Sequence, residues 1–504
     1  MRRPITTIFE AVALAHAASY LFLAITMLVA MPASAHSLEV ELSATDYQFG
    51  DKASLDRCTE EARRDEGVIG SAIAAARADR VLYARAFGYA DRERGIEATI
   101  DTRFAVASVT KILTATAIMM LVDEGKIDLD TPVNNYLGDD RVRATFGGAN
   151  LITVSRVMDH TAGLPLLYQP LYADEKSAKP EFSELIRDYG YTILPPGVSS
   201  QYSSFGYEIL AELIRRQSGM SYADFVRTRI FEPLNMNDSL IATGRRLPDG
   251  AAQRYMVDGT IAPGVDTSHP GAANAYLTVA DMIRFGRFWL AAYNGETPLL
   301  SQASARAMIT NDKGELGKGP GKGLWPEDYP GNTLYVSHGG SMAGAKARLA
   351  ILPDRDLVVA SAINERNSTA EAYLLEEMIR SFENESNLYW RAPVVPAAIA
   401  KSWRGTIGGN RKVADLELDF SDSNAPVARI DGKPVLVRGI GGEENFSIRL
   451  DGELSGAGMG VPHDLRLFLV PHGDQLIGEV RLESFPQTDR DHPSVGYWVR
   501  LQPA

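Results

Sequence analysis

An uncharged, largely apolar run from Ile112 to Val122 is the feature that most constrains the fold. The run contains no proline or glycine, and it ends at Asp123-Glu124-Gly125, where a glycine suits the position after a helix. The pattern predicts a helix over residues 108–124. Because a helix without a polar face must be buried, we expect it to lie inside its domain.

The first turn of this helix carries Ser108 and Lys111, three residues apart. Residues at this spacing share a helix face, so the amine can reach the hydroxyl. Burial favours the neutral amine of a lysine, and a neutral amine can accept the hydroxyl proton. The N–H groups at the helix start can stabilise negative charge nearby. An S-x-x-K pair also occurs by chance in long chains, so this one needs support from other motifs.

Strand patterns lie early and late in the first 380 residues, with helices between them. This order predicts an α+β domain in which the two ends of the chain close one antiparallel sheet, with a helical lobe inserted. The strands are expected at 68–77, 81–89, 334–337, 346–352 and 357–363. The helices are expected at 153–158, after Tyr202-Ser203-Ser204 as far as Gly219, at 276–293 with Thr278 as its N-cap, and from Ser368 onward.

The pattern changes between Asn384 and Pro396, and only short strand-like runs follow. Turns such as Asp431-Gly432 separate these runs. Many short strands at this spacing predict an all-β C-terminal domain, a small barrel or sandwich, over residues 396–504. The expected strands are 416–418, 427–430, 435–437, 446–450, 465–470, 476–482 and 497–501.

The N-terminus has the pattern of an export signal. Arg2 and Arg3 precede an apolar run from Ala17 to Met31, and Ala33-Ser34-Ala35 fits a cleavage site. We therefore expect a signal peptide at residues 1–35, a catalytic domain at 36–390, and a periplasmic or secreted protein. The apolar run is short for a membrane span, and an uncleaved N-terminal membrane anchor is the alternative.

Charge and composition exclude several classes of function. The net charge of −13 repels phosphate backbones, so no nucleic-acid partner is expected. The single cysteine, Cys58, excludes an intramolecular disulfide. The eight histidines include no H-E-x-x-H motif, and we expect neither a metal site nor a cofactor.

Two further stretches carry groups that suit acyl transfer. Tyr202-Ser203-Ser204 offers a phenol that can shuttle protons. His338-Gly339-Gly340 follows an expected strand, and its glycines let a substrate approach the backbone. The backbone N–H groups of Ser108 and Ser341 can then form an oxyanion hole.

The order S-x-x-K, Y-x-[NS] and [KH]-x-G over residues 55–382 resembles the serine β-lactamase and penicillin-binding-protein superfamily. The chain looks most like its class C β-lactamase, esterase and D-aminopeptidase branch. The resemblance implies a β-lactamase/transpeptidase-like fold in which Ser108 attacks a carbonyl, with Lys111 and Tyr202 as proton carriers. It also implies that Ser204 and the His338-Gly339-Gly340 segment bind substrate. We expect His160, in the loop 159–165, to hold that loop by hydrogen bonds.

Two residues depart from the common family pattern. Ser204 stands where the family often has asparagine, and His338 stands where it often has lysine. A histidine is largely neutral near pH 7, so selection of a substrate carboxylate is less secure. The resemblance therefore implies a hydrolase of small esters or amides, of the esterase or D-aminopeptidase type, whose partner is a small-molecule ester, amide or peptide substrate. The N-terminal pattern adds that this hydrolase is exported. The alternatives are a β-lactamase or D,D-carboxypeptidase, and a scaffold protein with a vestigial site. The C-terminal domain resembles the lipocalin-like barrels of some family members.

Overall fold

The computed structural model describes residues 56–503 apart from gaps, the longest of which are 312–319, 366–374, 383–400, 453–462 and 485–495. The expected signal peptide lies outside the described residues, as does the start of the helix expected from Ser368. None of the helices in the described ranges has the length and hydropathy that a bilayer crossing requires.

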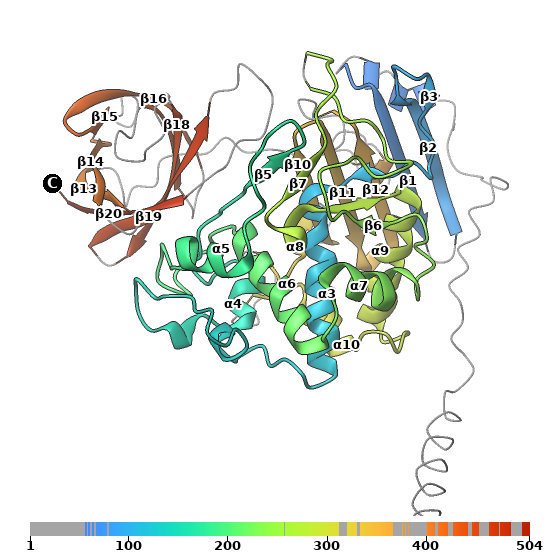
Figure 1. Ribbon diagram of the computed structural model, residues 1–504, viewed down its shortest axis with the longest axis horizontal. Coiled ribbons are helices and arrows are strands. Elements are labelled where there is room, and N and C mark those ends of the chain that lie inside the picture. The colour runs from blue at the N-terminus through green and yellow to red at the C-terminus, as the bar shows by residue number, and fades with distance from the viewer. Residues whose placement is uncertain are drawn as a thin grey trace, which may run out of the picture. The chain divides into compact units, whose positions relative to one another are not determined.

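A seven-stranded antiparallel sheet joins strands from residues 70–97 with strands from residues 325–363, as the sequence predicted (Figure 1). Its strand order is β3-β2-β1-β12-β11-β10-β9. The central pair is β1 (Gly70–Arg77) and β12 (Leu357–Ile363), in which Ala74 lies opposite Ala360. The other strands are β2 (Arg80–Asp91), β3 (Ile96–Glu97), β9 (Trp325–Tyr329), β10 (Thr333–Met342) and β11 (Ala345–Leu352).

The helix α3 (Thr110–Asp123) is buried, as its apolar sequence predicted. Every residue from Thr110 to Leu121 is buried, and Gly125 beyond its end has a φ of +68°. Burying each large aliphatic side chain contributes about 1.5–3 kcal/mol before conformational entropy is subtracted. The helix packs against α6 (Ser204–Ser218) and α8 (Pro270–Ala273), while α9 (Val279–Asn294) packs on the sheet. α3 is therefore a fixed base for the groups at its first turn.

Side chains that cap helix starts fix where the helices of the lobe begin. Thr153, Ser203 and Thr278 each accept a backbone N–H of the first turn that follows. The remaining helices are α4 (Val154–Met158), α5 (Phe182–Tyr189), α7 (Tyr222–Val226) and α10 (Gln302–Ala307). Two small sheets join loops of the lobe: β4 (Phe104–Ala105) with β8 (Ala275–Leu277) and β6 (Leu240–Ile241), and β5 (Pro170–Tyr172) with β7 (Val265–Thr267).

Several expected element bounds differ from the structure, and two of these differences bear on the site. The helix expected from residue 276 begins at Val279, because Ala275–Leu277 form β8 and pair with Phe104–Ala105. The strand expected to end at Ser337 continues to Met342. The His338-Gly339-Gly340 segment thus lies within β10, paired with β11, and does not follow the strand.

Residues 402–503 contain a closed antiparallel barrel, in agreement with the many short strands expected there. Its interior is one apolar cluster that includes Trp403, Ile407, Leu416, Val480 and Leu501. The first strand, β13, was not among the expected runs. The strands are β13 (Ser402–Gly408), β14 (Lys412–Asp419), β15 (Val427–Ile430), β16 (Lys433–Gly441), β17 (Phe446–Gly452), β18 (His463–His472), β19 (Gln475–Ser484) and β20 (Gly496–Pro503).

Candidate active site

Ser108 lies in a short 3-10 turn, Ala107–Val109, that leads directly into α3. Ala107 has a φ of +44°, which is uncommon for a residue with a side chain. The buried Thr110 hydroxyl holds this turn, since it donates to the Ala107 carbonyl at 2.6 Å and accepts the Ala275 N–H at 3.0 Å. Such backbone conformations cost about 1–3 kcal/mol and cluster at functional sites.

The Lys111 side chain is fully buried and ends among three oxygen atoms. Its Nζ lies 3.2 Å from Ser108 Oγ, 3.4 Å from Ser204 Oγ and 3.0 Å from the Ala272 carbonyl oxygen. Burial holds the pKa of the Lys111 amine well below its usual value. A neutral amine has two hydrogens and one lone pair, so it can donate to two of these oxygens and accept a proton from the third.

Tyr202 lies over Lys111, with the amine 4.8 Å from the centroid of the phenol ring. The loop around His160 positions it. The His160 ring accepts the Ser203 N–H through Nδ1 at 3.1 Å and lies 4.5 Å from the Tyr202 ring. The Ser203 hydroxyl donates to the Pro165 carbonyl at 2.6 Å. On the other side of Tyr202, the Gln201 N–H donates to the His160 carbonyl at 2.6 Å, so the chain is hydrogen-bonded on both sides of the phenol.

Strand β10 passes so close to the Ser108 turn that only glycine fits at residue 340. A Cβ built on Gly340 would lie 2.0 Å from the Val106 carbonyl oxygen and 2.9 Å from the Ser108 backbone nitrogen. This contact puts the Ser108 backbone beside that of Gly340 and Ser341. The two N–H groups expected to form an oxyanion hole thus belong to neighbouring backbone segments.

His338 points into the same space and is 5% exposed. Its Nδ1 lies 2.6 Å from the carbonyl oxygen of Gly339. Burial lowers the pKa of His338 to about 3, and the nearby Lys111 acts in the same direction. His338 is thus a neutral group at physiological pH, in keeping with its expected difference from a lysine.

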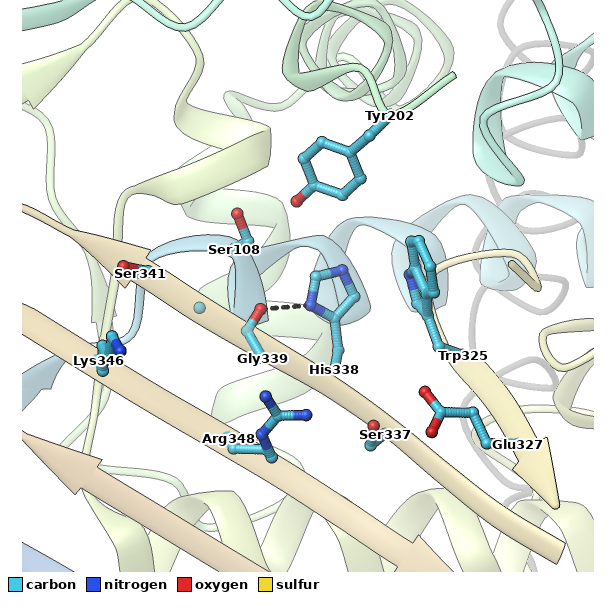
Figure 2. A pocket seen from close by; sticks show the side chains of 11 residues that line it. Ser108, Tyr202, Trp325, Glu327, Ser337, His338, Gly339, Ser341, Lys346 and Arg348 are labelled. Atoms are coloured by element: carbon cyan, nitrogen blue, oxygen red, sulfur yellow. Dashed lines mark hydrogen bonds between the residues drawn. The ribbon is translucent and has the colours of Figure 1, made fainter. Parts of the chain in front are cut away.

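A pocket of about 590 Å³ opens over these groups (Figure 2). Ser108, Tyr202 and the 338–341 segment line it, so the pocket joins the three motifs that are distant in sequence. Ser204 and Lys111 lie behind it. Sequence reasoning did not identify five further lining residues as part of the site: Trp325, Glu327, Ser337, Lys346 and Arg348. The alternation of charged and apolar residues at the start of 346–352 could have predicted that Lys346 and Arg348 lie on the same face of the strand.

No group of three or more histidine, cysteine, aspartate or glutamate side chains is arranged to hold a metal ion within the described residues.

Comparison with known proteins identifies the family. The model of the Beta-lactamase family matches residues 55–381. Penicillin-binding protein 4 of Amycolatopsis lactamdurans is 31% identical over 321 residues, which cover 60% of this chain and 83% of that protein. Esterase EstB of Burkholderia gladioli is 33% identical over 198 residues, which cover 37% of this chain and 50% of that protein.

Solved structures agree on the fold. The crystal structure of SurE is similar with a TM-score of 0.61 and 23% identity, covering 90% of this chain and 99% of that chain. At this identity the likeness speaks for the fold alone. A class C beta-lactamase is similar with a TM-score of 0.55 over 67% of this chain and 97% of that one. From the family match over residues 55–381, the chain belongs to the beta-lactamase family, and it is a serine hydrolase.

Proposed function

We propose that Ser108 is the nucleophile of an acyl-serine hydrolase and that Lys111 is its base. The observation that carries this proposal is the 3.2 Å separation between Ser108 Oγ and the amine of a fully buried lysine. Burial lowers the pKa of the Lys111 amine. The neutral form of the amine is therefore favoured. A weak nucleophile next to a neutral base is the arrangement that acyl transfer needs.

The proposed reaction begins when Lys111 takes the hydroxyl proton and Ser108 Oγ attacks the substrate carbonyl. The carbonyl oxygen gains the negative charge, and the N–H groups of Ser108 and Ser341 stabilise it. The bond to the leaving group then breaks, and that group takes a proton through Tyr202. Water next attacks the acyl-serine and gives one proton to Lys111 through Tyr202. Lys111 returns that proton to Ser108 Oγ as the bond to the acyl group breaks and the acid leaves.

The proposed substrates are small esters or amides, of the esterase or D-aminopeptidase type. The neutral His338 supports this class over carboxylate-bearing β-lactams, since it lacks the fixed charge of a lysine. Ser204 would orient the lysine, because its hydroxyl lies 3.4 Å from the Lys111 amine. The similarity to a penicillin-binding protein keeps β-lactam or D-alanyl peptide hydrolysis as the second candidate.

We also propose that the protein is exported to the periplasm or secreted. The apolar run from Ala17 to Met31 and the Ala33-Ser34-Ala35 site support this location. A substrate reached there would be a small extracellular or cell-wall compound. No cofactor enters the proposed reaction, because every proton transfer has a side chain to carry it.

Labelling of the nucleophile tests this proposal. Treatment with a fluorophosphonate, followed by intact mass measurement, should add one adduct to the wild type and none to Ser108→Ala. An adduct that survives in Ser108→Ala would exclude Ser108 as the nucleophile. The same two proteins are then assayed with a p-nitrophenyl ester, a D-aminoacyl amide, a cephalosporin and a D-Ala-D-Ala peptide. Faster turnover of the last two than of the first two would favour the second candidate.

A further inference from the structure

The hydrogen bond of His338 fixes which of its ring nitrogens carries the hydrogen. A carbonyl oxygen can only accept a hydrogen bond, so the Nδ1 that lies 2.6 Å from the Gly339 oxygen must be the donor. In a neutral imidazole the other nitrogen then has a lone pair and no hydrogen. His338 therefore presents an acceptor, Nε2, where a lysine would present only donors.

This acceptor is buried without a hydrogen-bond partner among the described residues. Leaving a buried acceptor unpaired costs about 1–3 kcal/mol, a cost that a bound group could remove. Figure 2 shows the ring between Ser108 and Trp325, with the Tyr202 hydroxyl directed toward Ser108 and not toward His338. The Tyr202 and Trp325 ring centroids lie 6.5 Å and 6.4 Å from that of His338.

We propose that His338 selects substrates that donate a hydrogen bond to its Nε2 atom, a proposal that rests on the proposed hydrolase function. The donor is an N–H or O–H group near the reacting carbonyl, such as a carboxamide, a hydroxyl or an ammonium. A carboxylate at the same place is rejected, because its oxygens would face a lone pair. Sites built to pair a buried polar group reject analogues that lack the matching group far more strongly than apolar pockets reject a change of size.

The surroundings of His338 suit the strongest of these donors, an ammonium. The rings of Tyr202 and Trp325 offer faces that attract cations. Glu327 lines the same pocket and can supply a carboxylate. The pocket's cations, Lys346 and Arg348, come from the next strand. These two cations can bind a substrate carboxylate, so a test must separate their effect from that of His338.

Matched esters provide this test. In one set, the carboxyl group of N-acetyl-D-alanine is esterified to the hydroxyl of lactic acid. The carboxyl group of the lactic acid is varied and is a carboxamide, a dimethylamide or a free carboxylate. The second set is the p-nitrophenyl esters of D-alanine and propionic acid, which differ by one ammonium. In at least one set the wild type should hydrolyse the donor-bearing ester at least tenfold faster, in kcat/KM, than its donor-free partner. The carboxylate should be the slowest of its set.

Two variants assign this preference to the lone pair. His338→Gln keeps an acceptor oxygen and should retain the order, whereas His338→Lys presents only donors and should shift it toward the carboxylate. Comparing each ester between proteins cancels its intrinsic reactivity. Fluorophosphonate labelling of Ser108 counts the intact sites, so a variant that folds poorly is corrected for.

Three outcomes would overturn the inference. Equal rates within both sets, with Ser108-dependent turnover intact, would leave the proposed hydrolase function standing without this selection. A carboxylate preference that is unchanged in His338→Lys would assign recognition to Lys346 and Arg348 instead. Absence of Ser108-dependent turnover and of labelling in the wild type would overturn the proposed function as well.

Discussion

The close approach of β10 to the Ser108 turn can be tested with one methyl group. A Cβ at residue 340 would lie 2.0 Å from the Val106 carbonyl oxygen, whereas an ordinary contact needs at least about 3.2 Å. In Gly340→Ala the strand and the turn must therefore separate by roughly 1 Å. A displacement of that size at reacting groups can cost about 100-fold in rate, equivalent to about 2.7 kcal/mol of transition-state stabilisation.

Gly339→Ala is the matched control. It adds the same methyl group to the adjacent residue of the same strand, and neither glycine has a positive φ that would strain an alanine. At residue 339 the new Cβ meets the Arg348 side chain, 3.2 Å from Nη2, and a flexible guanidinium can move by a few tenths of an ångström. We expect this variant to lose much less activity than Gly340→Ala, because a flexible side chain and not the backbone gives way.

The assay is kcat/KM for a neutral p-nitrophenyl ester, measured with the melting temperature of each variant. Active sites are counted by fluorophosphonate labelling, so that loss of folded protein is not mistaken for loss of rate. Overpacking should also destabilise Gly340→Ala by about 1–3 kcal/mol. Near-wild-type turnover per intact site in Gly340→Ala would refute the reasoning. Equal losses in both variants would show that the sheet, and not the contact with Val106, is sensitive.

Two further predictions concern the buried titratable groups. Lys111→Met should slow the labelling of Ser108 by about 10²–10⁴-fold. In the wild type, kcat/KM should rise with pH as the Lys111 amine loses its proton, and should level off well below pH 10.5. A rise with the same midpoint in Lys111→Met would assign it to another group. His338, with a pKa of about 3, stays neutral in the folded protein while the unfolded chain is protonated below about pH 6.5. Folding stability should therefore fall as the pH decreases from 6.5 toward 3, and between pH 7 and 4 the wild type should lose about 3 kcal/mol more than His338→Gln in denaturant unfolding. His269, also buried with a pKa of about 3, is present in both proteins and cancels, so equal losses would contradict the neutral His338.

The parts of the fold that the sequence predicted depend on local pattern. The uncharged, largely apolar run of α3 could only be buried. The three-residue spacing brought Ser108 and Lys111 together, although Ser108 lies in the 3-10 turn before α3 and not in the first turn of the helix as expected. The pairing of β1 with β12 followed from strands early and late with helices between them. The N-cap of α9, Thr278, was marked by its own side chain.

The parts that the sequence did not predict depend on contacts between distant residues. β9 contains Pro326 in its five residues, which argues against a strand, but β9 lies at the edge of the sheet, where a missing N–H is tolerated. Its Trp325 and Glu327 were missed for that reason. The two glycines of β10 indicated the end of a strand, whereas Gly340 is there because the backbone at Val106 approaches it.

Burial lowers the pKa of Lys111, so the protonation state of the proposed base depends on the groups that surround it in the site. A second ammonium at residue 338 would disfavour the charged form of Lys111 by repulsion, whereas the neutral His338 contributes no such charge. The amine then depends on exclusion of water, which the Tyr202 ring provides on one side, 4.8 Å away. A substrate that covers the pocket would extend the same exclusion. In the proposed mechanism, the groups that recognise the substrate and the base that activates Ser108 are therefore coupled through burial, so a substrate that fills the pocket should also favour the neutral form of Lys111.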